Sequence, residues 1–370
     1  MMKTAAMFGT DGGVSFAVEG FQNALRRVGE NTGNTLFQRA MWDLVPGPKI
    51  CAGPGVLAPG VAKQVADVLV IPAANQINPH FKMEAWTSYI QDADMPCVVV
   101  GLGAQSDDPS LSPEDLILPE GVKEFANAIA ARTETIGVRG EFTKRVLATL
   151  GVTNTVVTGC PSQTLNIRVS GQTIAKNIEK AKGNGSLIVA LLCGTLQDYT
   201  RAVEKNLYTL FKDSKHHTCI YQTEPRVLRF IHERHVDEDT RAFFIWMNKV
   251  VRPDLNLDQF FHYMAIHGRF YSDARSWIDA MRRVDVAIGM RIHGAVAAIQ
   301  AGKLGVCVAF DSRTLELAQT MGVPYVRASA IQEGMSLVDI LDQVQFNADA
   351  FEQKRSENIE AIRKIMKTLD

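Results

Sequence analysis

The sequence predicts an α/β protein built from two domains, each with a parallel β-sheet, that face each other across a cleft. Short apolar runs alternate with Gly- or Pro-rich turns and longer amphipathic stretches, which is typical of βα units. A chain of 370 residues is long enough for two domains. A polar stretch at residues 172–185, ending in a Gly/Asn cluster, separates two βα series of similar length and indicates the boundary.

The composition excludes several classes of protein. The chain has 39 Lys and Arg against 40 Asp and Glu, so its formal net charge is −1 and it has no bulk attraction for nucleic acid or anionic membranes. Hydrophobic residues make up 46% of the chain, which provides enough apolar surface to offset the entropy of folding and excludes disorder. We expect no nucleic-acid partner.

The first βα series lies within an expected N-terminal domain of residues 1–180. Its buried strands are separated by helices with polar outer faces. Strands are expected at residues 68–71, 97–102, 135–138 and 155–158. Helices are expected at residues 21–27, 36–45, 121–132 and 141–150.

The second series defines an expected C-terminal domain of residues 186–345. The remaining residues, 346–370, form a charged amphipathic helix, and the sequence leaves open whether it packs back on the first domain. Strands are expected at residues 186–192, 218–221, 269–272, 285–289, 305–310 and 325–326. Helices are expected at residues 201–211, 276–283, 294–301 and 313–321.

A charged segment at residues 224–258 interrupts the second series. His232 and His235 lie three residues apart among acidic residues, but no third ligand follows at a suitable spacing for a metal. A solvated helix face or cleft loop is the simpler interpretation, so we expect no metal. Trp246, in the same segment, is a candidate for lining the cleft.

The cysteines and the N-terminus favour a cytoplasmic protein. None of the six cysteines forms a CxxC pair, so reduced thiols are favoured over disulfides or a zinc site. The N-terminal residues lack the apolar core of a signal peptide. No apolar run reaches the roughly 18 residues of a membrane-spanning helix.

The strongest functional signal follows the strand expected at residues 285–289. Arg291 and His293 come directly after it, and a helix of small residues begins near Gly294. Ligands of open α/β sheets bind beyond the carboxyl ends of the strands, where a helix N-terminus offers free N–H groups to an anion. Arginine adds a fork for a carboxylate or phosphate, and histidine can act as a general acid near neutral pH.

The next strand ends in Asp311, with Arg313 two residues further on, which adds a second cation at the same sheet edge. A structural interpretation stays equally open from the pattern alone. In that interpretation Arg291 pairs with a structural carboxylate and His293 caps the helix.

Four blocks of sequence carry a resemblance to a known family. They are ENTGNTLFQRAMWDL at 30–44, DVLVIPAANQIN with MPCVVVGLGAQS within 67–105, VRGE with GCPS within 138–166, and GMRIHG, AAIQAGK and AFDSR from 289 onward. Together they resemble the polysaccharide pyruvyl transferase family over most of residues 30–330. Two departures are an Ala where the family's turn usually has Gly, in PAANQ, and Arg313 where the family has Lys.

The resemblance implies two facing Rossmann-like domains of the GT-B type. It also implies transfer of a pyruvyl group from phosphoenolpyruvate to two sugar hydroxyls, forming a ketal and releasing phosphate. In that scheme His293 is the general acid and Arg291 holds the donor, with no cofactor or metal. Further donor contacts fall on Arg139, Arg313 and Gly294.

The acceptor that the resemblance implies is a lipid-linked or oligosaccharide precursor of a polysaccharide or exopolysaccharide. Amide side chains suit sugar hydroxyls, because each offers donors and an acceptor. The same residues equally suit tight turns. The candidate acceptor contacts are Asn34, Asn75, Gln76 and Gln105.

Two other functions stay open. The first is a nucleotide-sugar glycosyltransferase, although such enzymes place two Glu residues near the last βα unit and this chain has only Glu316 besides Asp311. The second is a non-catalytic protein that binds a sugar or an anion.

Cys160 in GCPS is more simply a packed turn than a nucleophile. A homo-oligomer and a peripheral position at the inner membrane face are also left open.

Overall fold

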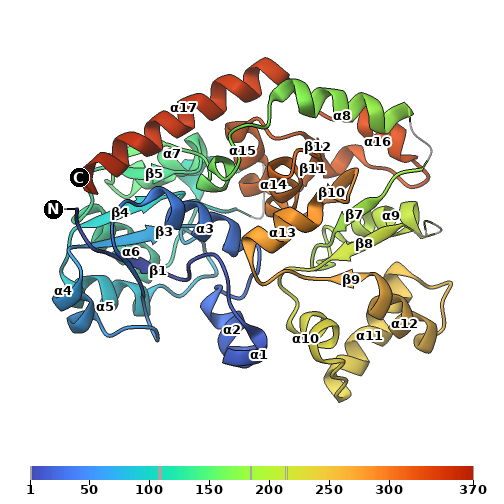
Figure 1. Ribbon diagram of the computed structural model, residues 1–370, viewed down its shortest axis with the longest axis horizontal. Helices are drawn as coiled ribbons and strands as arrows, with labels where there is room; N and C mark the ends of the chain where they lie inside the picture. Colours follow the sequence, from blue (N-terminus) through green and yellow to red (C-terminus); the bar gives the residue numbers. More distant parts are fainter. Residues whose placement is uncertain (1, 107–110, 184–185, 213, 215, 370) are drawn as a thin grey trace.

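Two parallel β-sheets occupy opposite halves of the molecule (Figure 1). The structure is a computed structural model that describes residues 2–106, 111–183, 186–212, 214 and 216–369. Each sheet is built from βα units, as the alternation of apolar runs and amphipathic stretches predicts, and the predicted two-unit α/β fold is confirmed.

The first sheet has the strand order β2-β1-β3-β4, and all its neighbours are parallel. A parallel bridge from Leu102 to Val138 links it to the pair β5-β6. The central strands are continuous apolar runs, as expected where helices cover both faces of a sheet. The strands are β1 Ala5–Phe8, β2 Lys49–Ala52, β3 Val68–Pro72, β4 Cys97–Val100, β5 Ile136–Val138 and β6 Thr155–Val157.

The second sheet has the order β12-β11-β10-β7-β8-β9, again entirely parallel. In the register of its centre, Gly289 lies opposite both Leu192 and Cys307, so β7 and β10 end at the same level and β11 continues to Ala309. The strands are β7 Val189–Leu192, β8 His217–Ile220, β9 Gly268–Arg269, β10 Val286–Gly289, β11 Leu304–Ala309 and β12 Tyr325–Arg327.

The helices follow the strands in both halves, and none in the described part of the chain is long and apolar enough to cross a membrane. Those that precede β7 in the chain are α1 Phe16–Glu19, α2 Phe21–Arg27, α3 Asn34–Leu44, α4 Pro59–Val65, α5 Glu84–Ala93, α6 Glu120–Ala130, α7 Glu141–Thr149 and α8 Gly171–Gly183. Those that follow β7 are α9 Arg201–Phe211, α10 Pro225–Glu233, α11 Glu238–Val251, α12 Leu257–His267, α13 Ala274–Met281, α14 Ile292–Gln300, α15 Ser312–Met321, α16 Leu337–Asp342 and α17 Ala348–Met366.

The polar stretch at residues 172–185 is largely the helix α8 in the structure. Its Ile174, Ile178 and Ala181 are buried at helical spacing, and the polar residues between them form the outer face. Asn184 and Gly185, at the end of the stretch, lie outside the described residues. The domain boundary that the sequence analysis places at this stretch stays a prediction.

The long C-terminal helix α17 crosses from the second half to the first (Figure 1). Its Ile362 and Ile365 lie in one apolar cluster with Val70 and Val98 of the first sheet. The two ends of the described chain meet there, where Lys3 Nζ donates a hydrogen bond of 2.6 Å to the backbone oxygen of Thr368. The last helix therefore completes the core of the first half.

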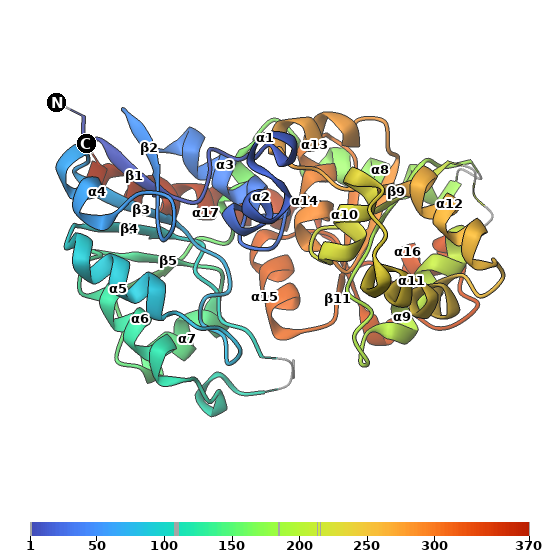
Figure 2. The ribbon, with the colours of Figure 1, turned by 90° about the horizontal axis from the view of Figure 1, so that it is seen from below.

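The first three helices also connect the halves. Figure 2 shows α1, α2 and α3 between the two sheets, and their Phe16, Leu25 and Leu36 belong to the apolar core of the second half. Backbone hydrogen bonds join the same regions, including Thr32 N to Gln222 O at 2.9 Å. The halves are thus tied together on both sides of the cavity described next.

Candidate active site

A cavity of about 1340 Å³ lies between the two halves, at the carboxyl ends of strands from both sheets. The first half lines it with residues that follow β1, β3 and β4, and the second with residues that follow β7, β10 and β11. One lining residue after each of these six strands is, in the same order, Gly9, Asn75, Gln105, Gly194, Arg291 and Asp311.

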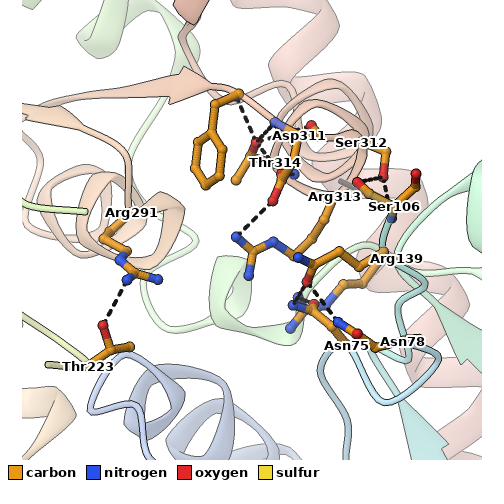
Figure 3. Close-up of polar contacts among 12 residues, drawn as sticks. Asn75, Asn78, Ser106, Arg139, Thr223, Arg291, Asp311, Ser312, Arg313 and Thr314 are labelled. Carbon is orange, nitrogen blue, oxygen red and sulfur yellow. Dashed lines mark hydrogen bonds and ion pairs between the residues drawn. The ribbon is translucent and has the colours of Figure 1, made fainter. Parts of the chain in front are cut away.

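Arg291 is positioned by the turn from β10 into α14. Gly289 precedes it with φ of +150°, and a Cβ there would lie 2.3 Å from the backbone oxygen of Leu192, so only glycine fits. The Arg291 guanidinium donates to Thr223 Oγ1 at 2.8 Å (Figure 3) and to the backbone oxygen of Cys193 at 3.4 Å. Burial, with a smaller effect of the nearby Arg313, lowers the pKa of Arg291 to about 10.

Arg313 lies in the first turn of α15. Asp311 caps that helix through Thr314, whose backbone N–H donates to Asp311 Oδ1 at 2.7 Å. The other carboxylate oxygen of Asp311 lies 3.2 Å from Arg313 Nη2. The buried Nε of Arg313 has no hydrogen-bond partner among the residues that the structure describes.

Arg139 approaches from the first half, directly after β5. It is buried, and its Nε and Nη1 donate to the backbone oxygen of Gly101 at 2.9 Å and to Asn75 Oδ1 at 2.6 Å. Its Nη2 is buried without a partner in the described part of the chain. Burial lowers the pKa of Arg139, and Arg313 adds to that effect. Figure 3 shows Arg313 extending between Arg139 and Arg291.

His293 lies behind this group of arginines, in the first turn of α14. The residue is 7% exposed, its Nε2 lies 3.6 Å from Cys160 Sγ, and its ring centroid lies 5.6 Å from that of Phe37. Burial lowers its pKa far below 6.5, and the charges of the three arginines lower it further. His293 is therefore neutral near pH 7 when the cavity holds no anion.

The structure brings together Arg139, Arg291, Arg313 and His293, all of which the sequence proposed for the donor. Arg291 and Arg313 line the cavity, whereas Arg139 and His293 are not among its lining residues. Gly294 is not among them either. Its N–H donates to the backbone oxygen of Arg291 at 2.9 Å, and a Cβ would lie 2.5 Å from the Leu192 side chain.

The four amide residues proposed for the acceptor all line the cavity, but they differ in what they bind. Asn75 Nδ2 donates to Gln105 Oε1 at 3.1 Å, and Asn78, which the sequence analysis missed, donates to the same oxygen at 3.2 Å. Gln76 Oε1 accepts from the backbone N–H of Ala74 at 2.6 Å, which is a turn contact.

Asn34 makes a structural contact at the start of α3. Its Nδ2 donates to the backbone oxygen of Val28 at 2.9 Å and holds the end of α2 against α3. The side-chain amides of Asn34 and Gln76 thus each form a hydrogen bond with nearby backbone. Those of Asn75 and Gln105 instead belong to a side-chain network within the cavity.

Glu204 is a site residue that the sequence analysis missed. It lies on α9, lines the cavity, and accepts hydrogen bonds from Thr200 Oγ1 at 2.8 Å and Leu196 N at 2.9 Å. Its second oxygen is buried without a partner among the described residues, and burial raises its pKa. One carboxylate in a polar helix gives no signal in sequence. The structure shows that the Glu204 carboxylate packs against Gly194 at the end of β7, where a Cβ would lie 2.6 Å from it.

Residues of the charged segment 224–258 do not reach the cavity lining. Trp246, a candidate for the cleft, lies 5.4 Å from the Arg201 guanidinium instead. His235 pairs with Asp237 at 3.2 Å, and His232 packs against Phe16 with ring centroids 5.7 Å apart. Within the described ranges, no group of three or more His, Cys, Asp or Glu could hold a metal ion.

The fold and the site together define a two-unit α/β protein with a cavity between its halves that is lined by Arg291 and Arg313. The model of the polysaccharide pyruvyl transferase family matches residues 21–312, and the chain belongs to this family. A search of the curated proteins finds no match.

Solved structures offer remote likenesses. One is a UDP-N-acetylglucosamine 2-epimerase from Rickettsia bellii, with 10% identity, a TM-score of 0.47, and coverage of 99% of this chain and 95% of that chain. Another is Anabaena HepE in complex with UDP and glucose, with 10% identity, a TM-score of 0.45, and coverage of 100% and 98%. Likenesses at these TM-scores define neither a ligand nor an activity for this chain.

Proposed function

We propose that this protein transfers the pyruvyl group of phosphoenolpyruvate to two hydroxyls of a sugar, forming a cyclic ketal and releasing phosphate. The observation that carries the proposal is that Arg291 and Arg313 line the cavity while Arg139 lies beside them, and that all three are close enough to His293 to lower its pKa. Phosphoenolpyruvate carries a carboxylate and a phosphate close together, so its site needs several cations within a small volume.

Nearby carboxylates offset this positive charge only in part. Asp311 pairs with Arg313. Burial raises the pKa of Glu204 and of Glu316, which favours their uncharged forms. The three guanidinium groups therefore favour binding of an anion with more than one charge.

Two of the three arginines contact the donor, and the third acts without touching it. Arg291 and Arg313 line the cavity and contact the phosphate and the carboxylate. Arg139 acts through its hydrogen bond to Asn75, which orients that amide, and through its positive potential. The bound anion also raises the pKa of His293, because it offsets the charges that lower it.

The chemistry follows from that change. His293, protonated when the donor binds, gives its proton to the methylene carbon, and the central carbon becomes electrophilic. One acceptor hydroxyl adds to the central carbon and loses its proton. Phosphate then leaves, and the second hydroxyl adds and loses its proton to close the ring. One donor and one diol thus give one ketal and one inorganic phosphate, and no water is consumed.

The acceptor lies on the side of the first half, against the amide network of Asn75, Asn78 and Gln105. Each amide offers donors and an acceptor to sugar hydroxyls, and Asn75 joins this network to the cation cluster through Arg139. A lipid-linked or oligosaccharide precursor of a polysaccharide is the acceptor class that we propose.

No observation favours a nucleotide-sugar glycosyltransferase. Glu316, the candidate for holding a sugar nucleotide, accepts hydrogen bonds from the backbone N–H and the hydroxyl of Thr143, each at 2.9 Å. It joins α15 to α7 and is buried, so it is committed to the contact between the halves.

The assay that tests the proposal incubates the full chain with phosphoenolpyruvate and a panel of lipid-linked and aryl sugars. Phosphate release together with a product mass gain of one pyruvate less one water supports it. Parallel reactions with UDP- and GDP-sugars serve as the comparison. Nucleotide release in these reactions, without phosphate release from phosphoenolpyruvate, would overturn it.

Replacing the proposed acid separates binding from chemistry. His293→Ala should lower the transfer rate by about 10²- to 10⁴-fold, the usual contribution of a general acid. The affinity for phosphoenolpyruvate should stay close to that of the parent, because the three arginines remain. His235→Ala, at an exposed surface pair, is the matched control. A parental transfer rate in His293→Ala would remove the acid assignment.

A further inference from the structure

Two aromatic side chains form part of the cavity wall on the side of the second half. Tyr199 lies in the loop between β7 and α9, and Phe310 directly follows β11. Their ring centroids are 6.2 Å apart, and the planes are tilted by 37°. Tyr199 is 53% exposed, whereas Phe310 is partly buried. The donor contacts and the proton transfer described above use neither side chain.

The aromatic pair begins next to the arginines of the donor site. The guanidinium carbon of Arg313 lies 6.0 Å from the ring centroid of Phe310. The backbone N–H of Phe310 donates to Thr314 Oγ1 at 3.2 Å, within the turn that caps α15 and positions Arg313. Phe310 therefore has a fixed place beside the donor, and Tyr199 extends the same aromatic surface.

The acceptor of the proposed reaction has to lie in this part of the cavity. Its hydroxyls add to the central carbon of phosphoenolpyruvate, so its ring must come into contact with the bound donor. A pyranose ring has C–H groups on its faces and hydroxyls around its edge. Aromatic rings pack well against the C–H groups, whereas amides bind the hydroxyls. The cavity offers both, because the amides of Asn75, Asn78 and Gln105 line it from the first half.

We propose that Tyr199 and Phe310 form a stacking surface for the acceptor sugar. A face of a pyranose ring that is free of axial hydroxyls packs on the two aromatic rings, while hydroxyls at its edge reach the donor and the amides of the first half. This role rests on the proposed function, which supplies the sugar acceptor. The binding of a pyranose to the stacking surface, however, needs no donor and can be measured by itself.

Tyr199 is the better position for a test, because its side chain is exposed. Substitution of an exposed side chain usually changes stability little, so Tyr199→Ala should fold as the parent does. Phe310 packs against the apolar core of the second half, and its replacement would also disturb the turn before Arg313. Tyr199→Phe keeps the ring and removes only the hydroxyl, so it separates stacking from hydrogen bonding.

The first test is kinetic and uses the full chain with an acceptor that it pyruvylates. Tyr199→Ala should raise KM for the acceptor about tenfold, with KM for phosphoenolpyruvate changed by less than about twofold, because one aromatic contact to the sugar is lost. Tyr199→Phe should stay within about threefold of the parent, because the ring remains. Ile266→Ala, at an exposed residue of α12 outside the cavity lining, is the control. An unchanged acceptor KM in Tyr199→Ala would overturn the proposal, as would an equal loss in Tyr199→Phe.

The second test measures binding without the donor, by saturation-transfer difference nuclear magnetic resonance. The probes are the methyl glycosides of glucopyranose, galactopyranose and mannopyranose, with UDP for comparison. A pyranoside that binds the parent and Tyr199→Phe should lose at least about threefold of its signal in Tyr199→Ala. Equal pyranoside signals in the three proteins would overturn the stacking surface. A loss in Tyr199→Ala that affects UDP but not the pyranosides would do so too, because the surface would then hold a nucleobase.

The two tests distinguish failure of the stacking surface from failure of the proposed function. Pyranoside binding that depends on Tyr199, without transfer to any acceptor, would support the stacking surface and count against pyruvyl transfer. Pyruvyl transfer with the same acceptor KM in the parent and in Tyr199→Ala would support the proposed function and overturn the stacking surface. Absence of both pyranoside binding and transfer would overturn both.

Discussion

Arg291 leaves part of its guanidinium for a ligand. Nε and Nη2 donate to backbone and side-chain oxygens at the ends of β7 and β8, and Nη1 has no hydrogen-bond partner among the described residues. The fixed fork therefore presents a free N–H edge at the cavity wall, which suits bidentate binding of a phosphate or carboxylate.

Arg291→Lys should weaken the binding of phosphoenolpyruvate about tenfold, because an ammonium keeps the charge but not the fork. Isothermal titration calorimetry of the full chain with phosphoenolpyruvate measures the effect. Arg241→Lys, an exposed arginine on α11, is the control and should change nothing. An unchanged affinity in Arg291→Lys would remove this residue from the donor site.

His293 should also make stability depend on pH. Its pKa in the folded protein is far below 6.5, chiefly through burial, so between these values the unfolded chain binds a proton that the folded chain does not. The contribution of His293 to the free energy of unfolding is therefore fully present above pH 6.5. It decreases as the pH falls below 6.5, by up to about 1.4 kcal/mol per pH unit. Urea unfolding from about pH 7.5 to 5.5 should show a steeper decline for the wild type than for His293→Gln. Parallel curves would contradict this.

Much of the cation cluster could be predicted from the sequence, because two of its arginines directly follow strands of the same parallel sheet. Parallel strands present their carboxyl ends at one edge of a sheet, so Arg291 and Arg313 had to lie near one another. The contact between Cys160 and His293 spans 133 residues. No spacing rule predicts it, since it depends on how the halves dock. Glu204 and Asn78 make their contacts within one half each, and they were missed because a single polar side chain gives no signal in sequence.

At the scale of elements, a contact between α7 and α15 joins the two halves. Glu316 of α15 binds the N-terminus of α7 through Thr143. Gly140, the residue before α7, lies so close that a Cβ there would be 2.4 Å from Glu316 Cγ. The position of Arg313, three residues before Glu316 on α15, therefore depends on a glycine in the other half.

Gly140→Ala should destabilise the protein by about 1–3 kcal/mol, because the added methyl group overpacks this contact. Denaturant unfolding monitored by fluorescence measures the change. Gly60→Ala is the matched control, because no atom lies within 4 Å of the added carbon and α4 should accept alanine readily. Equal stability of Gly140→Ala and the wild type would mean that this contact is not tightly packed.

Strands and helices with strong periodicity were predicted to within a few residues, among them β10, α9 and α14. The first two strands were missed. β1 has the sequence AAMF, which has no β-branched residue, and β2 is short and only partly buried. Their place in the sheet is set by pairing with β3, which no local pattern reveals.

At the scale of the molecule, the C-terminal helix is part of the first half. Ile362 of α17 is fully buried against the first sheet. Ile362→Ala should cost about 2–5 kcal/mol of stability, through lost burial and the cavity left behind. Thermal or urea unfolding measures the loss, and Ile117→Ala, at a side chain that is 87% exposed, should fall within about 0.5 kcal/mol of the parent. Similar effects of the two variants would mean that α17 does not support the first half.

The path of α17 also has a consequence for biosynthesis. Domains usually fold as units while the ribosome is still adding residues, the N-terminal one first. Here the face of the first sheet that carries Val70 and Val98 stays uncovered until α17, near the end of the described chain, has been made. The nascent N-terminal half must therefore keep an apolar surface exposed through most of translation, and its final folding step awaits the last helix.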